Sequence, residues 1–82
     1  MRRVDVEVMA KYQLDGKIIP VSVKWDDGRM FEIDQVLDIR PAASTKVGGA
    51  GIRYQIRIGR TSTYLFLEEN NWFVEAKDVR AI

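Results

Sequence analysis

The feature that most constrains this chain is a regular alternation of apolar and polar residues near its amino terminus. Every second residue from position 4 to position 14 is apolar, namely Val4, Val6, Val8, Ala10, Tyr12 and Leu14. The positions between them are charged or polar, with Met9 as the exception. Successive side chains of a β-strand point to opposite faces, so a period of two predicts a strand with one buried face. Such a strand needs partners that cover its apolar row.

The residues that follow supply the first partner. Asp15-Gly16 is a dipeptide typical of a tight hairpin turn. A two-residue turn there sets apolar residues opposite one another, in the pairs Tyr12–Ile19, Ala10–Val21, Val8–Val23 and Val6–Trp25. The other face then carries the opposite-charge pair Glu7–Lys24, which is favourable. Pro20 lacks a ladder donor and indicates an exposed or bulged stretch in the second strand.

A second hairpin follows at Asp26-Asp27-Gly28. A three-residue loop ending in Gly pairs Val23 with Phe31 and Val21 with Ile33, again apolar against apolar. Leu37 and Ile39 continue the inward phase, whereas Val36 is expected to face outward. This break in the alternation predicts a bend or bulge near residues 34–36. Arg40-Pro41 ends the strand, because proline has no N–H to donate.

The second half of the chain repeats the pattern after a Gly-rich loop. We expect residues 43–51 to be the least ordered internal segment, and Gly48–Gly51 lacks the Lys-Ser/Thr ending of a phosphate-binding P-loop. Strands over residues 52–58 and 64–67 are joined by a turn at Gly59-Arg60, and a turn at Asn70-Asn71 leads into the last strand. These turns place Leu65 beside Tyr54 and Ala76. They place Leu67 beside Ile52 and Val74.

About six antiparallel strands with short connections form a meander. A flat sheet of this size leaves apolar surface in water, so the meander should curl into a small barrel or roll. We therefore predict an all-β single domain over residues 1–82, with an SH3-like barrel or another partly open small barrel as the architecture. No segment has helical periodicity over a useful length.

Composition excludes several classes of function. The chain has neither cysteine nor histidine, so it offers no Cys/His zinc site, no Ser-His or Cys-His nucleophile and no imidazole base. Asp26 and Asp27 lie in a turn, and Glu68 and Glu69 flank another. Asp34 and Asp38 are too far apart along a strand-like segment to share chemistry, and nothing places a pair of carboxylates in a pocket. We expect a non-enzymatic protein with no metal and no cofactor. We also expect no membrane partner and a cytoplasmic location, because no apolar segment approaches membrane-spanning length.

Charge is distributed unevenly along a chain whose formal net charge is only +1. No Asp or Glu occurs between Ile39 and Leu67, and all five charged residues there are basic: Arg40, Lys46, Arg53, Arg57 and Arg60. The predicted register puts Arg53, Arg57, Tyr64 and Phe66 on the face opposite the core. Arginines beside aromatic rings on a sheet suit single-stranded nucleic acid, because the rings stack on bases and the guanidinium groups neutralise phosphates. These five basic residues, Tyr64 and Phe66 form the candidate nucleic-acid-binding set.

Two alternatives remain open at this point. A terminal segment or a second subunit that covers this face would make its aromatics ordinary buried side chains, and a longer loop over residues 59–63 would exchange the two faces. The second functional hypothesis is a protein-interaction module or a homodimerising structural protein, because aromatic residues and arginine are favoured at interfaces.

An ordered set of short motifs runs through the last two-thirds of the chain. They are Lys24-Trp25, Asp27-Gly28-Arg29, Val36-Leu37-Asp38, Gly48 to Tyr54, Tyr64-Leu65-Phe66 and Trp72 to Glu75. In this set the chain resembles a group of short uncharacterised bacterial proteins. The resemblance implies a stand-alone bacterial cytoplasmic protein and transfers no functional residue.

Overall fold

The computed structural model describes residues 2–42 and 51–76, which form seven β-strands. The strands are β1 (Arg2–Tyr12), β2 (Ile18–Lys24), β3 (Met30–Glu32), β4 (Gln35–Pro41), β5 (Gly51–Ile58), β6 (Thr61–Glu68) and β7 (Asn71–Ala76). These described ranges contain no helix, and hence none that could cross a membrane. The all-β prediction is confirmed.

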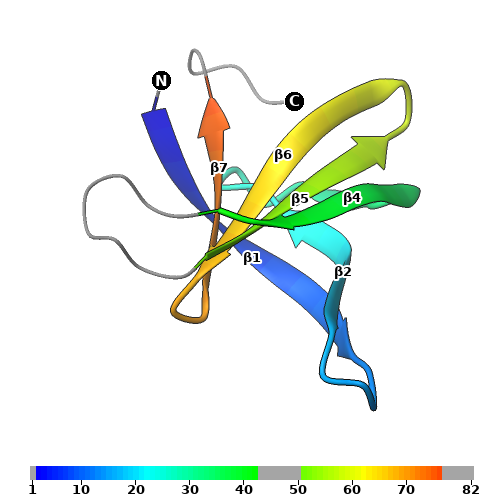
Figure 1. Cartoon of the computed structure of the whole chain (residues 1–82). Helices are drawn as coiled ribbons and strands as arrows, with labels where there is room; N and C mark the ends of the chain where they lie inside the picture. Colours follow the sequence, from blue (N-terminus) through cyan, green and yellow to red (C-terminus); the bar gives the residue numbers. More distant parts are fainter. Residues whose placement is uncertain (1, 43–50, 77–82) are drawn as a thin grey trace.

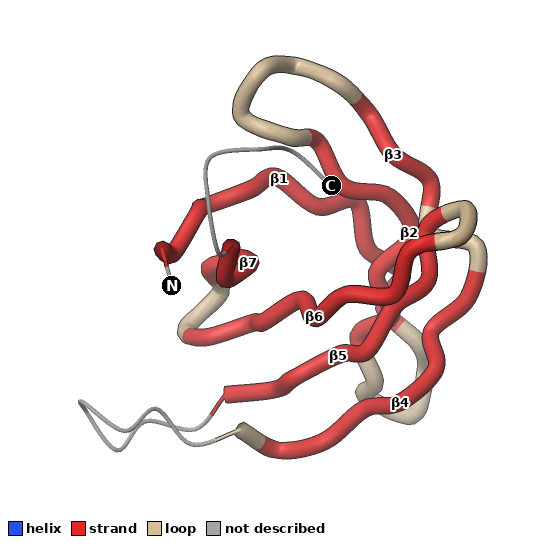
Figure 2. The backbone as a smooth tube through the Cα atoms, turned by 90° about the horizontal axis from the view of Figure 1, so that it is seen from above, coloured by secondary structure: helices blue, strands red, loops and turns tan. Residues whose placement is uncertain are grey.

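The strands form one antiparallel sheet with the order β3-β2-β1-β7-β6-β5-β4. The sheet curls on itself into a half-barrel, as the view along its interior shows (Figures 1 and 2). The long strand β1 permits the curl, because its first half pairs with β7 and its second half pairs with β2. The predicted meander, curled into a small and partly open barrel or roll, is confirmed.

The passage from β3 to β4 carries the chain between the two ends of the strand order. The N–H of Ile33 donates to Val21 of β2 at 2.9 Å, and the N–H of the next residue, Asp34, donates to Arg57 of β5 at 2.9 Å. Consecutive residues thus hydrogen-bond to opposite halves of the sheet. This junction draws the two ends of the strand order together.

The core lies inside the curl and is built from alternate residues of five strands and one turn. Its buried members are Val4, Val23, Trp25, Tyr54, Ile56, Leu65, Leu67 and Val74. Trp25 is 6% exposed, which confirms its predicted core position. The Tyr54 hydroxyl donates to the carbonyl of Ile18 at 2.6 Å, so a polar group inside the curl joins β5 to β2.

The first hairpin differs from the prediction at its tip. The N–H of Gln13 donates to Lys17 and that of Gly16 donates to Gln13, which makes a three-residue loop of residues 14–16. The longer loop shifts the pairs near the tip, so that Tyr12 faces Ile18 and Ala10 faces Pro20. The predicted pairs Tyr12–Ile19 and Ala10–Val21 are therefore wrong.

A bulge between Met9 and Ala10 then restores the expected register. Val8 faces Val23 and Glu7 faces Lys24, as predicted, and the irregularity expected from Pro20 is confirmed. The predicted pair Val6–Trp25 lies beyond this ladder, where Val6 pairs with Trp72 instead. Tyr12 and Leu14 were expected to face the core, but they are 75% and 109% exposed, because the tip of the hairpin extends past the strands that could cover it.

The second hairpin has the predicted three-residue loop. Trp25 and Arg29 close it at 2.8 Å, Gly28 has a φ of +91°, and Val23 faces Phe31. The N–H of Arg29 donates to the Asp27 carboxylate, and this bond chiefly lowers the pKa of Asp27. Val21 contacts Ile33 as expected but is 44% exposed, because it is the extra residue of the bulge.

The predicted irregularity in the next strand lies slightly farther along the chain. The register shifts between Val36 and Asp38, so Leu37 is the bulged residue. As a result Val36 faces Ile56 and packs on the core, which corrects the outward position expected for it. Ile39 faces Tyr54, a buried core residue, so it keeps its predicted inward position, although it is 42% exposed at this end of the sheet. Leu37 was also expected to point inward, but as the bulged residue it is 41% exposed.

The last three strands follow the predicted faces. Leu65 pairs with Tyr54 and Leu67 with Ile52 around a two-residue turn at Gly59-Arg60, as expected. The final turn is one residue earlier than predicted, at Glu69-Asn70, where both residues have positive φ. Leu67 therefore pairs with Trp72 rather than Val74. A two-residue shift leaves each side chain on its expected face.

Candidate nucleic-acid interface

The outer face of the sheet carries a transverse row of side chains. The pairings run from Arg40 on β4 to Arg53 on β5, then to Phe66 on β6, Phe73 on β7 and Asp5 on β1. Directly paired residues of antiparallel strands lie on the same face. Register alone therefore brings three of the sequence-predicted residues, Arg40, Arg53 and Phe66, into one line.

Arg53 and Tyr64 form a solvent-accessible pair on this face. The guanidinium carbon of Arg53 lies 4.7 Å from the centre of the Tyr64 ring, within the range of a cation–π interaction. Tyr64 is 43% exposed, and Arg53 is partly exposed. The pair presents a planar cation and an aromatic ring to solvent on a rigid strand pair.

The ring of Phe66 stacks on the ring of a residue from the next strand. Its ring lies 5.1 Å from that of Phe73, with an angle of 9° between their planes. The Arg3 guanidinium lies 4.0 Å from the centre of the Phe73 ring. Phe73 is only 7% exposed and Phe66 is partly buried, so these rings offer less free surface than Tyr64.

The remaining predicted residues are less closely grouped. Arg40 is exposed and pairs with Asp38 at 2.6 Å. Arg57 donates to the carbonyl of Gly59 at 2.9 Å and lies 3.9 Å from the Asp34 carboxylate. Arg60 is exposed in the β5–β6 turn, and Lys46 lies outside the described residues.

In the folded protein, positive and negative charges are more evenly mixed than the acid-free segment between Ile39 and Leu67 indicates. Asp34 and Asp38 precede the acid-free segment in the sequence but pair with two of its arginines. Of the predicted arginines on the described strands, Arg53 has no carboxylate within ion-pair distance in the described part of the chain. A ligand can therefore reach the Arg53 guanidinium without displacing any carboxylate of the described residues.

Sequence reasoning missed Arg3, which closes one end of the aromatic stack. Its position depends on the pairing of β1 with β7, where Arg3 faces Glu75 and Asp5 faces Phe73. No turn connects these two strands, so turn arithmetic could not reveal their register. The only available signal was the alternation in β1, which places Arg3 and Asp5 on its polar face.

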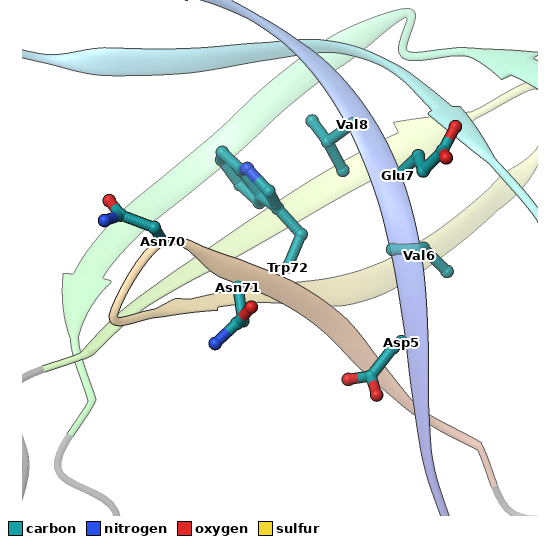
Figure 3. Close-up of a pocket in the computed structure, with 7 residues that line it drawn as sticks. All are labelled: Asp5, Val6, Glu7, Val8, Asn70, Asn71 and Trp72. Atoms are coloured by element: carbon teal, nitrogen blue, oxygen red, sulfur yellow. The ribbon is translucent and has the colours of Figure 1, made fainter.

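A surface hollow of about 440 Å³ lies where β1 crosses the start of β7. Figure 3 shows the Trp72 indole beside Val8, and the carboxylates of Asp5 and Glu7 extending to opposite sides of β1. Within residues 2–42 and 51–76, no three metal-ligating side chains gather at one point.

Comparisons with protein-family models, with curated proteins and with solved structures found no significant match. Function therefore has to be inferred from the geometry of the outer face.

Proposed function

We propose that the protein is a non-catalytic binding module for single-stranded nucleic acid, and that the outer face of β5 and β6 is its binding surface. The observation that carries the proposal is the Arg53–Tyr64 pair, a guanidinium held 4.7 Å from a ring that is 43% exposed. Exposed rings stack on bases of any sequence, and an arginine beside them can neutralise a phosphate or stack on the next base.

The neighbouring residues support a short site rather than a long groove. Phe66 adds apolar surface next to Arg53, and Arg40 lies across the strand pair on the other side. Because Arg40 and Arg57 already have carboxylate partners, an incoming phosphate competes with Asp38 and Asp34 for them. We therefore expect weak binding with a shallow salt dependence, near the slope of about −0.7 expected for one neutralised phosphate on a single strand.

The test is a titration of a fluorescein-labelled oligothymidylate or oligouridylate, followed by fluorescence anisotropy at several salt concentrations. Tyr64→Ala should weaken binding by about 1–3 kcal/mol and leave the salt slope unchanged, because it removes a stacking partner. Arg53→Ala should also weaken binding, and it should bring the slope close to zero.

Arg29→Ala is a matched control. Arg29 also lies over an aromatic ring, that of Phe31 at 5.3 Å, and also has an exposed side chain, but it belongs to the β2–β3 hairpin. The control should bind like the parent protein, and each variant should keep the parent's unfolding midpoint. Failure of the parent to bind at low salt, or equal losses for Arg53→Ala and Arg29→Ala, would rule out the proposed surface.

A further inference from the structure

Strand β4 lies at one end of the strand order and has a free edge. Residues Gln35–Pro41 pair with β5 along one edge, and no strand of the described ranges pairs with the other. Figure 2 shows β4 along the rim of the curled sheet. Two large apolar residues of this strand, Leu37 and Ile39, are 41% and 42% exposed. An open edge with exposed apolar residues is a template for pairing with another chain.

The hydrogen-bonding pattern shows which backbone groups this edge offers. The N–H of Ala42 donates to Gly51 of β5, and the direction of backbone groups alternates along a strand. Arg40, two residues earlier, therefore directs its N–H and C=O toward β5, whereas Ile39 directs its own toward the free edge. Pro41 has no N–H, which limits pairing beyond that point.

Ile39 is flanked by residues of opposite charge, so two copies of this segment can pair with each other. If two copies of β4 pair antiparallel about a two-fold axis at Ile39, Asp38 of each copy faces Arg40 of the other. An axis at Asp38 or at Arg40 would instead set like charges face to face, which is unfavourable. Asp38 and Arg40 already lie 2.6 Å apart within one chain, so both project from the same face of the strand.

The apolar face of the same strand favours the same register. A cavity of about 320 Å³ opens beside Ile39 and is lined mainly by apolar side chains. Its lining residues are Gly16, Lys17, Ile18, Ile39, Ile52 and Tyr54. Directly opposed residues of an antiparallel pair share a face, so the Ile39 side chain of a second copy would lie at the mouth of this cavity.

We propose that the chain forms a homodimer by antiparallel pairing of two β4 edges about Ile39, with two Asp38–Arg40 ion pairs between the copies. An isologous two-fold contact of this kind closes at the dimer and leaves no further β4 edge for a third copy. The proposal is independent of nucleic-acid binding.

Two variants whose β4 edges carry opposite charge test the proposed register. Asp38→Arg makes the edge wholly basic, and Arg40→Asp makes it wholly acidic, so each variant should dimerise at least about tenfold more weakly than the parent. An equimolar mixture of the two should form a heterodimer, because every facing pair is then opposite in charge. The double variant with both substitutions restores complementarity and should dimerise like the parent. Sedimentation equilibrium without nucleic acid measures all of these association constants.

The matched controls are Glu7→Arg and Lys24→Asp, which make the same charge changes at an exposed pair that is 3.9 Å apart on β1 and β2. Neither control should alter dimerisation, and their mixture should gain nothing over the parent. A parent protein that remains monomeric to millimolar concentration would overturn the proposal. So would a mixture of the two edge variants that stays monomeric, or control variants that behave like the edge variants.

Discussion

At the scale of single residues, Tyr54 shows how one polar atom can be held inside an apolar core. The side chain is 1% exposed, its ring packs 5.4 Å from that of Trp72, and its hydroxyl donates to the Ile18 carbonyl. Burial chiefly raises the pKa of Tyr54, and the charge of nearby Tyr12 contributes in the same direction. The alternation in β5 predicts that this ring is buried, but the bond to β2 depends on the curl of the whole sheet.

Tyr54→Phe tests this bond in two ways. Loss of the hydrogen bond should lower the free energy of unfolding by about 0.5–1.5 kcal/mol at neutral pH. The raised pKa also makes stability depend on pH, because the unfolded chain releases the Tyr54 proton first, at its ordinary pKa of 10.0. Its contribution to stability is therefore fully present below about pH 10 and is lost as the pH rises further toward the pKa of the folded state. Urea unfolding at pH 8, 10 and 11 should show a smaller alkaline loss in the variant, and equal losses would contradict the assignment.

Trp25 is the largest side chain of the core and comes from a turn rather than a strand. Trp25→Ala should cost about 3–5 kcal/mol, the usual range for a buried large aromatic residue. Denaturant unfolding measures the loss. A loss below about 1 kcal/mol would show that Trp25 contributes little to the core in solution.

At the scale of the element, the β1–β2 hairpin shows that an apolar alternating segment can form strands without being buried. Its tip projects at the lower right of Figure 1, and there the apolar alternation continues where no core is present. Leu14→Ser should therefore change the free energy of unfolding by no more than about 0.5 kcal/mol. Leu65→Ala, at a fully buried position of β6, should cost about 2–5 kcal/mol. Similar losses for the two variants would mean that the tip is covered in solution.

Gly51, at the start of β5, is required by a close approach of neighbouring strands. A Cβ atom added there would lie 2.8 Å from the Ala42 carbonyl oxygen and 2.9 Å from Cγ of Glu68. The backbone oxygen cannot move away cheaply, so Gly51→Ala should cost about 1–3 kcal/mol. Gly59→Asn is the control, because its φ of +60° suits Asn and no atom lies within 4 Å of its Cβ position. Thermal unfolding of the two variants should differ clearly, and equal midpoints would contradict the crowding argument.

The same elements show what the sequence could predict. Alternation and turn chemistry were sufficient for the Val8–Val23 and Leu65–Tyr54 pairs, because each turn fixes the register of the two strands that it joins. The positions of the bulges were harder to predict. The bulge falls at Leu37 because Val36, rather than a neighbouring residue, pairs with Ile56, and the sequence does not show which residue makes that pair. The outer-face position of Arg53 and Tyr64 was predictable for the same reason. The carboxylate partners of Arg40 and Arg57 were not predictable, because a sequence segment without acids does not show which acidic residues lie beside it in the fold.

At the scale of the whole molecule, the sheet consists of two local meanders, β1 to β3 and β4 to β7. Every described pairing within each of them joins two successive strands. The pairing of β1 with β7 joins residues from opposite ends of the chain, including Val4 with Val74. Such non-local contacts are slow to form, because the chain entropy is lost before the contact is made.

This organisation predicts different kinetic effects for two core substitutions. Leu65→Ala weakens a local hairpin and should slow refolding, whereas Val4→Ala weakens the late β1–β7 contact and should mainly speed unfolding. Stopped-flow refolding and unfolding in denaturant give both rates. A larger slowing of refolding for Val4→Ala than for Leu65→Ala would reverse the proposed order of assembly.

The pairing of β1 with β7 also has a consequence during synthesis. The first half of β1 emerges from the ribosome well before its partner strand β7, which begins only at Asn71. At about 5–20 residues per second, several seconds pass between the two events. Throughout that interval the apolar side of β1 around Val4 and Val6 lacks its partner on β7. Transiently exposed apolar surface of this kind favours aggregation of a nascent chain, and the arrival of β7 removes the exposure.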